Sequence, residues 1–381
     1  MNQTVTPSSL LPDSSPADTR TGVLPAQQIH ALIRAKDIRA INDITPEQVQ
    51  PASLDLRLDK IAYRVRASFL PGPNGNVMDK LRQLDAYEID LSQGAVLEKG
   101  CVYVIPLQES LDLKADITAT ANPKSSTGRL DIFTRLITDK ASAFDRIERG
   151  YKGPLYLEVA PQTFSVIARP GVKLNQIRFK RGNPLPVGQA ELREKFANKE
   201  LIEGGSQQAD FRGGRIDFSI DLIGTQRNGL IGYRARKHAD RIDLEKIGHY
   251  DPLDFWEPIH GRPNHPLVLD PADFYILVTQ ETVKIPPDYA AEMLPYDTSV
   301  GEFRVHYAGF FDPGFGWGDT PSKAVLEVRS HDVPFLLEHG QVVGRLQYEY
   351  MASRPERLYG QGGGSNYQGQ DLALGKQFRR G

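Results

Sequence analysis

The sequence predicts a mainly β protein made of two tandem copies of one domain, with short helices. Short alternating or apolar runs are separated by many of the 34 glycines and 27 prolines, a pattern typical of antiparallel sandwiches or barrels. Five sequence landmarks recur 166 to 173 residues further along the chain. Such a near-constant offset indicates a duplication with small changes in loop length. The 381 residues are enough for two ordinary domains.

Composition excludes several classes of protein. The net charge of −2 argues against a general nucleic-acid-binding protein, which would carry a basic excess. Cys101 is the single cysteine, so the chain can form neither an intrachain disulfide nor a Cys-rich zinc site. No apolar run approaches the length of a membrane helix. We therefore expect a cytoplasmic protein with no membrane or nucleic-acid partner.

The first half of the chain begins with a tail and a helix and continues as strands. Residues 1–22 are rich in Ser, Thr and Pro and lack a signal-peptide pattern, so we expect a disordered tail. Residues 25–38 have helical spacing, with Ile29, Leu32 and Ile33 on one face. Strands are then predicted at 50–58, 102–106, 117–121, 132–137, 154–159, 163–168 and 174–179.

The second half repeats this order. Residues 189–202 again have a helical pattern, and five later segments echo five earlier ones: 217–222 echoes 52–56, 274–277 echoes 102–105, 298–301 echoes 125–128, 324–328 echoes 155–159, and 339–343 echoes 170–174. The polar stretch 182–189 is the expected junction. We therefore divide the chain into the tail (1–22), a first half (23–185), a second half (186–353) and a C-terminal segment (354–381).

Two motifs in the first half carry chemistry. Lys124-Ser125-Ser126-Thr127-Gly128-Arg129, called the phosphate motif below, combines two cations, three hydroxyls and a glycine that allows close backbone approach, as a polyphosphate cradle requires. Ile147-Glu148-Arg149-Gly150-Tyr151-Lys152-Gly153 predicts a tight turn, and Glu158 follows in an apolar strand. The alternatives are an ordinary polar turn for the first motif and a solvent-facing strand carboxylate for Glu158.

The C-terminal segment has a different composition. Residues 358–370 contain too many glycines for a strand or helix, together with Tyr359, Asn366 and Gln370. This composition favours a mobile flap that orders over a ligand, and a plain disordered tail is the alternative.

Taken together, these motifs resemble those of the dCTP deaminases of the dUTPase-like (β-clip) superfamily, in a long, duplicated form. The phosphate motif is similar to that family's Arg-Ser-Ser-x-x-Arg, and the turn to its Ile-Asp-Pro-Gly-Trp-x-Gly. Glu158 follows Tyr151 by seven residues, as the family's catalytic glutamate follows its tryptophan. Tyr359, Asn366 and Gln370 have the spacing of the Tyr, Lys and Gln that close over the triphosphate. The resemblance implies two distorted β-barrel domains of the β-clip type.

The chain departs from that pattern at several positions. Lys124 replaces an arginine, which keeps the charge and loses the bidentate fork, Glu148 replaces Asp, and Asn366 replaces Lys. In the second half Glu302 stands where Arg129 stands in the first, so the second phosphate motif looks broken. Residues 311–315 nevertheless match the turn motif better than the first half does. We expect the first half to keep the chemistry and the second to lend the flap.

The resemblance implies hydrolytic deamination of dCTP to dUTP and ammonia. Glu158 would shuttle the protons, Ser125 would position the water, and Arg129 would stabilise developing charge. Backbone groups of Tyr156 and Leu157 would bind the base. Mg²⁺ would be held through the substrate triphosphate, without metal-ligating residues of the protein. The signature of zinc-dependent deaminases is absent.

The resemblance also implies further partners and leaves two alternative functions open. dTTP or dUTP would act as inhibitor or product, and the protein would form a homo-oligomer. The 147–153 turn also resembles the diphosphatase pattern Ile-Asp-x-x-Tyr-Arg-Gly, so dUTP diphosphatase activity, alone or combined with deamination, is the first alternative. A catalytically silent nucleotide sensor is the second, because both halves carry substituted motifs.

Overall fold

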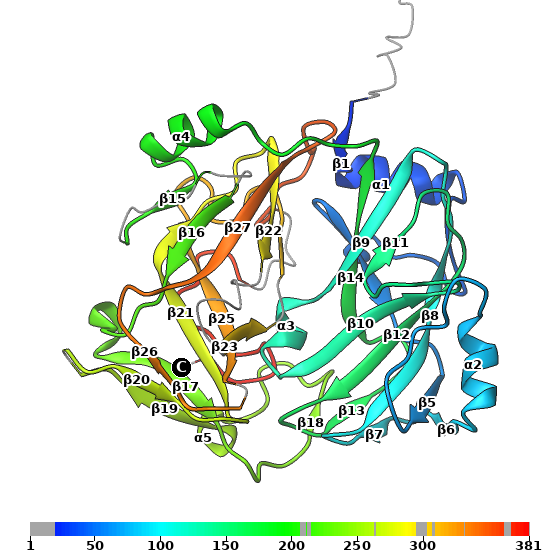
Figure 1. Ribbon diagram of the computed structural model, residues 1–381, viewed down its shortest axis with the longest axis horizontal. Coiled ribbons are helices and arrows are strands. Elements are labelled where there is room, and N and C mark those ends of the chain that lie inside the picture. Colours follow the sequence, from blue (N-terminus) through cyan, green and yellow to red (C-terminus); the bar gives the residue numbers. More distant parts are fainter. Residues whose placement is uncertain are drawn as a thin grey trace, which may run out of the picture.

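The structure is a computed structural model that describes residues 20–205, 211, 215–262, 264–294, 303–306, 309–330, 332–361 and 367–380. Within these residues, only the backbone is described for 226 and 303–306. Three of the expectations above concern residues outside the described part: tail residues 1–19, the second-half motif at 298–302, and Asn366. The described part is mainly β, as predicted, with the two halves side by side (Figure 1).

The first half is built from two large sheets and a small one. One sheet has the order β11-β9-β14-β4-β3, with β1 added on β14: Arg146–Ile147, Ile117–Pro123, Lys173–Arg181, Ser53–Arg57, Val49–Gln50 and Gly22–Val23. The other has the order β10-β12-β8-β5-β6, with β2 added on β8: Ile132–Thr138, Lys152–Pro161, Val102–Asp112, Ile61–Val65, Tyr87–Asp90 and Ile38–Ala40. The small sheet joins β7 (Ala95–Leu97) and β13 (Val166–Ala168) to β18 (Ile242–Asp243) from the second half.

The second half repeats the same strand order. Its first sheet runs β16-β27-β22-β24: Arg215–Ser219, Val342–Tyr350, Tyr289–Leu294 and Phe310–Phe311. Its second runs β19-β17-β21-β25-β23, with β15 on β21: Trp256–His260, Leu230–Ala235, Phe274–Val283, Ser322–Ser330, Phe303–His306 and Ile202–Glu203. A third pairs β20 (Leu267–Leu269) with β26 (Phe335–Leu337). The matching orders agree with the tandem duplication that the repeated landmarks predicted.

Each half opens with a helix, as expected. These are α1 (Ala26–Arg34), which buries Ile29 and Leu32, and α4 (Gln189–Ala197), which is shorter than predicted because the chain has turned into β15 by Ile202. The sequence did not predict the shorter helices, because they span one or two turns: α2 (Val77–Gln83), α3 (Ser125–Gly128), α5 (Pro252–Phe255), η1 (Pro46–Gln48) and η2 (Thr225–Arg227). No helix in the described ranges is long and apolar enough to cross a bilayer.

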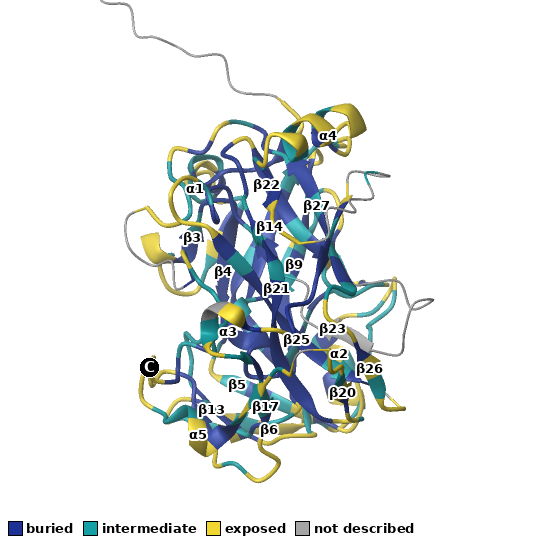
Figure 2. Ribbon diagram, turned by 90° about the vertical axis from the view of Figure 1, so that its left-hand side faces the viewer, coloured by how far each residue is buried: buried dark blue, intermediate teal, exposed yellow. Residues whose placement is uncertain are grey.

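The larger apolar core contains residues of both halves, such as Phe164 and Trp256, a second core lies within the second half, and the halves also meet along a polar seam. Figure 2 shows buried strands running through both halves. At the seam, Arg178 of β14 is fully buried and donates to the Ala291 carbonyl of β22 at 2.9 Å and to Asp312 Oδ1 at 3.0 Å. Because a buried arginine needs its partners, this seam fixes how the two halves face each other. It also borders the candidate site.

Candidate active site

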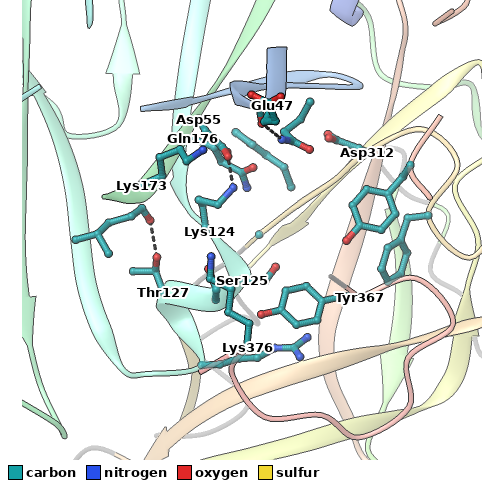
Figure 3. A pocket seen from close by; sticks show the side chains of 18 of the residues that line it. Glu47, Asp55, Lys124, Ser125, Thr127, Lys173, Gln176, Asp312, Tyr367 and Lys376 are labelled. Carbon is teal, nitrogen blue, oxygen red and sulfur yellow. Dashed lines mark hydrogen bonds and ion pairs between the residues drawn. The ribbon is translucent and has the colours of Figure 1, made fainter. Parts of the chain in front are cut away.

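A cavity of about 760 Å³ lies between the halves and takes residues from both. The first half contributes Lys124, Ser125 and Arg129, and the second contributes Asp312 and Glu327. Residues of the C-terminal segment complete the lining (Figure 3). A pocket of this size that mixes apolar walls with converging charged groups is what a nucleotide site requires.

Local structure separates the roles within the phosphate motif. The motif forms the single turn α3, and Thr127 Oγ1 donates to the Leu174 carbonyl of β14 at 2.7 Å, so this hydroxyl fixes the turn. Ser125 remains half-buried at the cavity wall. Lys124 forms an ion pair with Asp55 of β4. Lys124, Ser126 and Thr127 line the cavity as expected, while Gly128 is buried within α3.

Arg129 connects the phosphate motif to the C-terminal segment. Its side chain is buried, with Nη1 donating to the Ala373 carbonyl at 3.0 Å and Nη2 to Gln370 Oε1 at 2.7 Å. The guanidinium also lies over the Tyr367 ring, 3.9 Å from its centroid. Nε has no hydrogen-bond partner among the described residues and lies 4.0 Å from Glu327 Oε1. Arg129 therefore places positive charge directly beside a second-half carboxylate.

Glu327 is the buried acid of this cavity. It lies on β25, is 3% exposed, and among the described residues its one ion-pair contact is the long one to Arg129. Burial raises the pKa of Glu327 to about 8, and the charge of Arg129 opposes this rise only in part. A carboxyl group with such a pKa can both donate and accept a proton near neutral pH.

The structure corrects the expected position of Glu158. This residue is buried on β12, where Arg135 of β10 donates to its Oε1 from Nη2 at 2.7 Å and from Nε at 3.0 Å. It is not part of the cavity that holds Ser125 and Arg129. Strand β12 thus carries Glu158 outside this cavity, whereas Glu327 of the second half lies within it beside the first-half motif. The expectation that Glu158 lies beside the serine pair was wrong.

The signal that could have identified Glu327 was present in the sequence. Residues 324–328 echo 155–159, which makes Glu327 the counterpart of Glu158. We did not consider Glu327 as a catalytic residue, because we expected the second half to contribute only the C-terminal flap to the site. Tyr156 and Leu157 are buried beside Glu158 and lie outside the cavity, while Val325, the counterpart of Tyr156, lines it.

The two turn motifs also lie in different places. Asp312 of the second half lines the cavity and is held by Arg178. Glu148 of the first half instead lines a separate pocket of about 460 Å³, together with Tyr151 and Lys152. Gly314 follows Asp312 with φ 95°, and a Cβ there would come within 2.8 Å of the Tyr359 amide nitrogen. Glycine at this position lets the C-terminal segment pass directly over the turn.

Packing and hydrogen bonds hold the described residues of the C-terminal segment against the cavity. Tyr359 packs on Phe315 with ring centroids 5.6 Å apart, and its amide donates to the Pro313 carbonyl at 2.7 Å. Gln370 accepts from Arg129 and donates to the Lys323 carbonyl at 3.0 Å. Both line the cavity as expected. Sequence reasoning missed three further lining residues, Lys173, Tyr367 and Lys376, because they lie outside the motifs.

The comparisons with known proteins point to one family. Residues 20–183 match the N-terminal domain of 2'-deoxycytidine 5'-triphosphate deaminase, and residues 188–378 match its C-terminal domain. The chain is 36% identical over 179 residues to a protein of Beutenbergia cavernae, which covers 45% of this chain and 90% of the relative. It is 34% identical over 137 residues to one of Kocuria rhizophila, which covers 34% and 69%. Both relatives are named "dCTP deaminase, dUMP-forming".

A solved structure is similar over most of the chain. It is the crystal structure of 2'-deoxycytidine 5'-triphosphate deaminase from Agrobacterium tumefaciens, which is 56% identical in sequence. The match has a TM-score of 0.84 and covers 90% of this chain and 99% of that one. The similarity therefore extends over both halves.

Proposed function

The chain belongs to the 2'-deoxycytidine 5'-triphosphate deaminase family, whose reaction is the hydrolytic deamination of dCTP in pyrimidine nucleotide metabolism, and we propose that this chain carries out the reaction in the cavity between its halves. One observation carries the proposal. Glu327 is buried 4.0 Å from Arg129, in a cavity that Ser125 also lines. An acid, a hydroxyl and a guanidinium from two copies of the domain thus converge in one site.

The geometry supports a separate role in the reaction for each of Glu327, Ser125 and Arg129. Protonated Glu327 gives its proton to N3 of the cytosine ring while water adds to C4, and the carboxylate takes the proton that the water loses. A second transfer through Glu327 to the exocyclic nitrogen lets ammonia leave and restores the carbonyl at C4. The Ser125 hydroxyl holds the water. Arg129 stabilises the negative charge that Glu327 carries after each proton donation and before it accepts the next proton.

The remaining polar lining fits the nucleotide. Lys124, Ser125 and Ser126 face the triphosphate side of the cavity, and Val325 with Phe311 borders the space for the base. Mg²⁺ enters with the triphosphate. Glu47 and Asp55 line the cavity and could reach such an ion directly or through water, while the described residues contain no cluster of three or more metal-ligating side chains.

A second activity, cleavage of the triphosphate to give dUMP, is favoured by two observations. The two relatives described above are named dUMP-forming, whereas the sequence led us to expect dUTP as the product. Asp312 also lines this cavity, at the second-half position equivalent to Glu148, whose 147–153 turn resembles the diphosphatase pattern. We propose that a water molecule activated by Asp312 attacks the α-phosphate after deamination. A nucleotide sensor without turnover receives no support from this arrangement.

The other expectations remain predictions of the same proposal. Each half would be a dUTPase-like β-clip, which the repeated strand orders support. The protein would be a cytoplasmic homo-oligomer and would also bind dTTP or dUTP. Separately, the first-half pocket that holds Glu148 would be available to a neighbouring chain.

Product analysis tests both activities. Purified protein is incubated with dCTP and Mg²⁺, and ammonia, pyrophosphate and uracil nucleotides are measured over time. We expect ammonia, with dUMP and pyrophosphate in equal amounts. Ammonia with dUTP alone would remove the second activity, and no ammonia from either dCTP or dCMP would contradict the deaminase assignment.

A further inference from the structure

Three lysines converge on one side of the cavity: Lys124, Lys173 and Lys376. Lys124 is neutralised by Asp55. Within the described ranges, neither Lys173 nor Lys376 has a carboxylate within 4.0 Å. Figure 3 shows Lys376 near Ser125, below Lys124. This side of the cavity therefore holds two positive charges that no described carboxylate pairs with.

The surroundings of Lys376 shift the pKa of its side chain. Burial lowers its pKa, and the charges of Lys124 and Lys173 lower it further, while Asp55 acts in the opposite direction. An ammonium group held away from water without a counterion costs free energy. An anion bound among the three lysines would remove that cost.

The backbone holds Lys376 in place from both sides. Gly248 donates to the Lys376 carbonyl at 2.9 Å, and His249 donates to the Gln377 carbonyl at 2.8 Å. Phe378 is buried, with its ring centroid 5.5 Å from Phe255 and 5.9 Å from Trp256. The lysine therefore projects from an anchored backbone, which reduces the entropy lost when it binds a ligand.

Of the other described groups of the C-terminal segment that line the cavity, Arg357 is charged, and its Nη2 donates to the Val49 carbonyl. Tyr359 and Gln370 are uncharged, as is Asn366 in the sequence. The two Nη atoms of Arg129 are already bound to the Gln370 side chain and the Ala373 carbonyl. Of the described cations in the lining, Lys173 and Lys376 are the two whose side chains have neither an ion pair nor a hydrogen bond.

We propose that Lys376, assisted by Lys173, binds the polyphosphate chain of the nucleotide and gives the site its preference for triphosphates. The inference rests on the proposed function, because that function supplies the triphosphate. It assigns to a residue near the C-terminus a role that the motifs do not indicate.

The test uses the full chain with Lys376→Met, Lys376→Arg and the control Lys246→Met. Lys246 is an exposed lysine of the nearby loop and lies outside the cavity lining, so its loss matches the change in net charge. For each protein, kcat and KM for dCTP, the affinity for inorganic tripolyphosphate and inhibition by deoxycytidine are measured. Melting temperatures without ligand report on folding.

We expect Lys376→Met to raise the KM for dCTP and the Kd for tripolyphosphate by about 10- to 100-fold, as for the loss of a charged hydrogen bond. The values of kcat and the deoxycytidine affinity should stay within about threefold, because the interaction is equal in ground and transition states. Lys376→Arg should retain most of the affinity. The melting temperature of Lys376→Met should not fall, since the variant removes a half-buried charge that has no ion pair.

The outcomes separate the two proposals. Unchanged tripolyphosphate affinity in a folded Lys376→Met protein overturns this inference, whether or not dCTP is deaminated. Loss of tripolyphosphate binding in that variant, with Lys246→Met unaffected, supports the inference even if the wild-type protein releases no ammonia. Equal losses of tripolyphosphate affinity in Lys376→Met and Lys246→Met would show that the effect comes from net charge alone. That result would also overturn the inference.

Discussion

Glu158 and Glu327 occupy equivalent positions in the two copies of the fold, yet their surroundings are opposite. Glu158 faces Arg135 across the β10–β12 pair and receives two hydrogen bonds from it. Glu327 has His306 at the corresponding register position, and among the described side chains its ion-pair contact is with Arg129 from the other half. The same residue type on the same strand is thus ion-paired in one copy and left with a raised pKa in the other.

The two halves also differ in what they retain. The first half keeps the phosphate motif, with Arg129 buried at the seam, while the second carries Glu302 at that position in the sequence. The second half keeps Asp312 in the cavity, while Glu148 of the first lies elsewhere. The halves are therefore complementary: the first places the residues of the phosphate motif in the cavity, and the second places Asp312 and Glu327 there.

The largest effect is expected when the two equivalent glutamates, Glu327 and Glu158, are substituted in turn. Glu327→Gln should lower kcat for dCTP deamination by about 10²–10⁴-fold, because the amide cannot shuttle protons. Glu158→Gln is the matched control and should stay within about threefold, since its amide oxygen can still accept from Arg135. Steady-state ammonia release measures both. If Glu158→Gln lost more kcat than Glu327→Gln, Glu158 of the first half would be the catalytic acid and the assignment of Glu327 would be wrong.

A smaller effect is expected for the two turn carboxylates. Asp312→Asn should lower kcat/KM for dCTP by about 10- to 100-fold and abolish pyrophosphate release, because Asp312 lines the cavity and binds Arg178. Glu148→Gln, in the separate pocket, should change neither value by more than about twofold. Nucleotide products are separated by ion-exchange chromatography. Pyrophosphate release that persists in Asp312→Asn would exclude Asp312 as the activating base.

The smallest effect concerns stability and pH. The folded-state pKa of Glu327 is about 8, above the value in an unfolded chain, so folding retains a proton that the unfolded state loses. Stability that is present at about pH 4 should therefore fall as the pH rises to about 8. The stability of Glu327→Gln does not fall in this way, because glutamine has no proton to lose. At pH 8 this variant should therefore melt roughly 2–8 °C above the wild-type protein.

Glu158→Gln provides the comparison in the same experiment. Asp145, whose pKa burial raises to about 7, stays in every variant and therefore cancels in the difference. Thermal unfolding from pH 5 to pH 9 measures each protein. Equal slopes for Glu327→Gln and the wild-type protein would show that Glu327 is ionised in the folded state at neutral pH.

Much of the fold could be predicted because its signals are local. Alternation and turn residues located strands such as β9 and β10, and the spacing of Ile29 and Leu32 located α1. Short elements such as α2 could not be predicted, because a helix of two turns depends on tertiary packing more than on its own residues.

The sequence by itself determined that one β domain occurs twice and which residues are equivalent in the two copies, and it predicted an anion-binding motif at residues 124–129. Only the tertiary structure decided which acid meets that motif. Spacing along the chain fixes neighbours within a strand or turn. The contact between Arg129 and Glu327 depends instead on how the two halves pack against each other, through a shared apolar core and the Arg178 seam. That packing places the half-buried Lys376 and the buried Glu327 in one cavity, where loss of solvent contact shifts the pKa values of both.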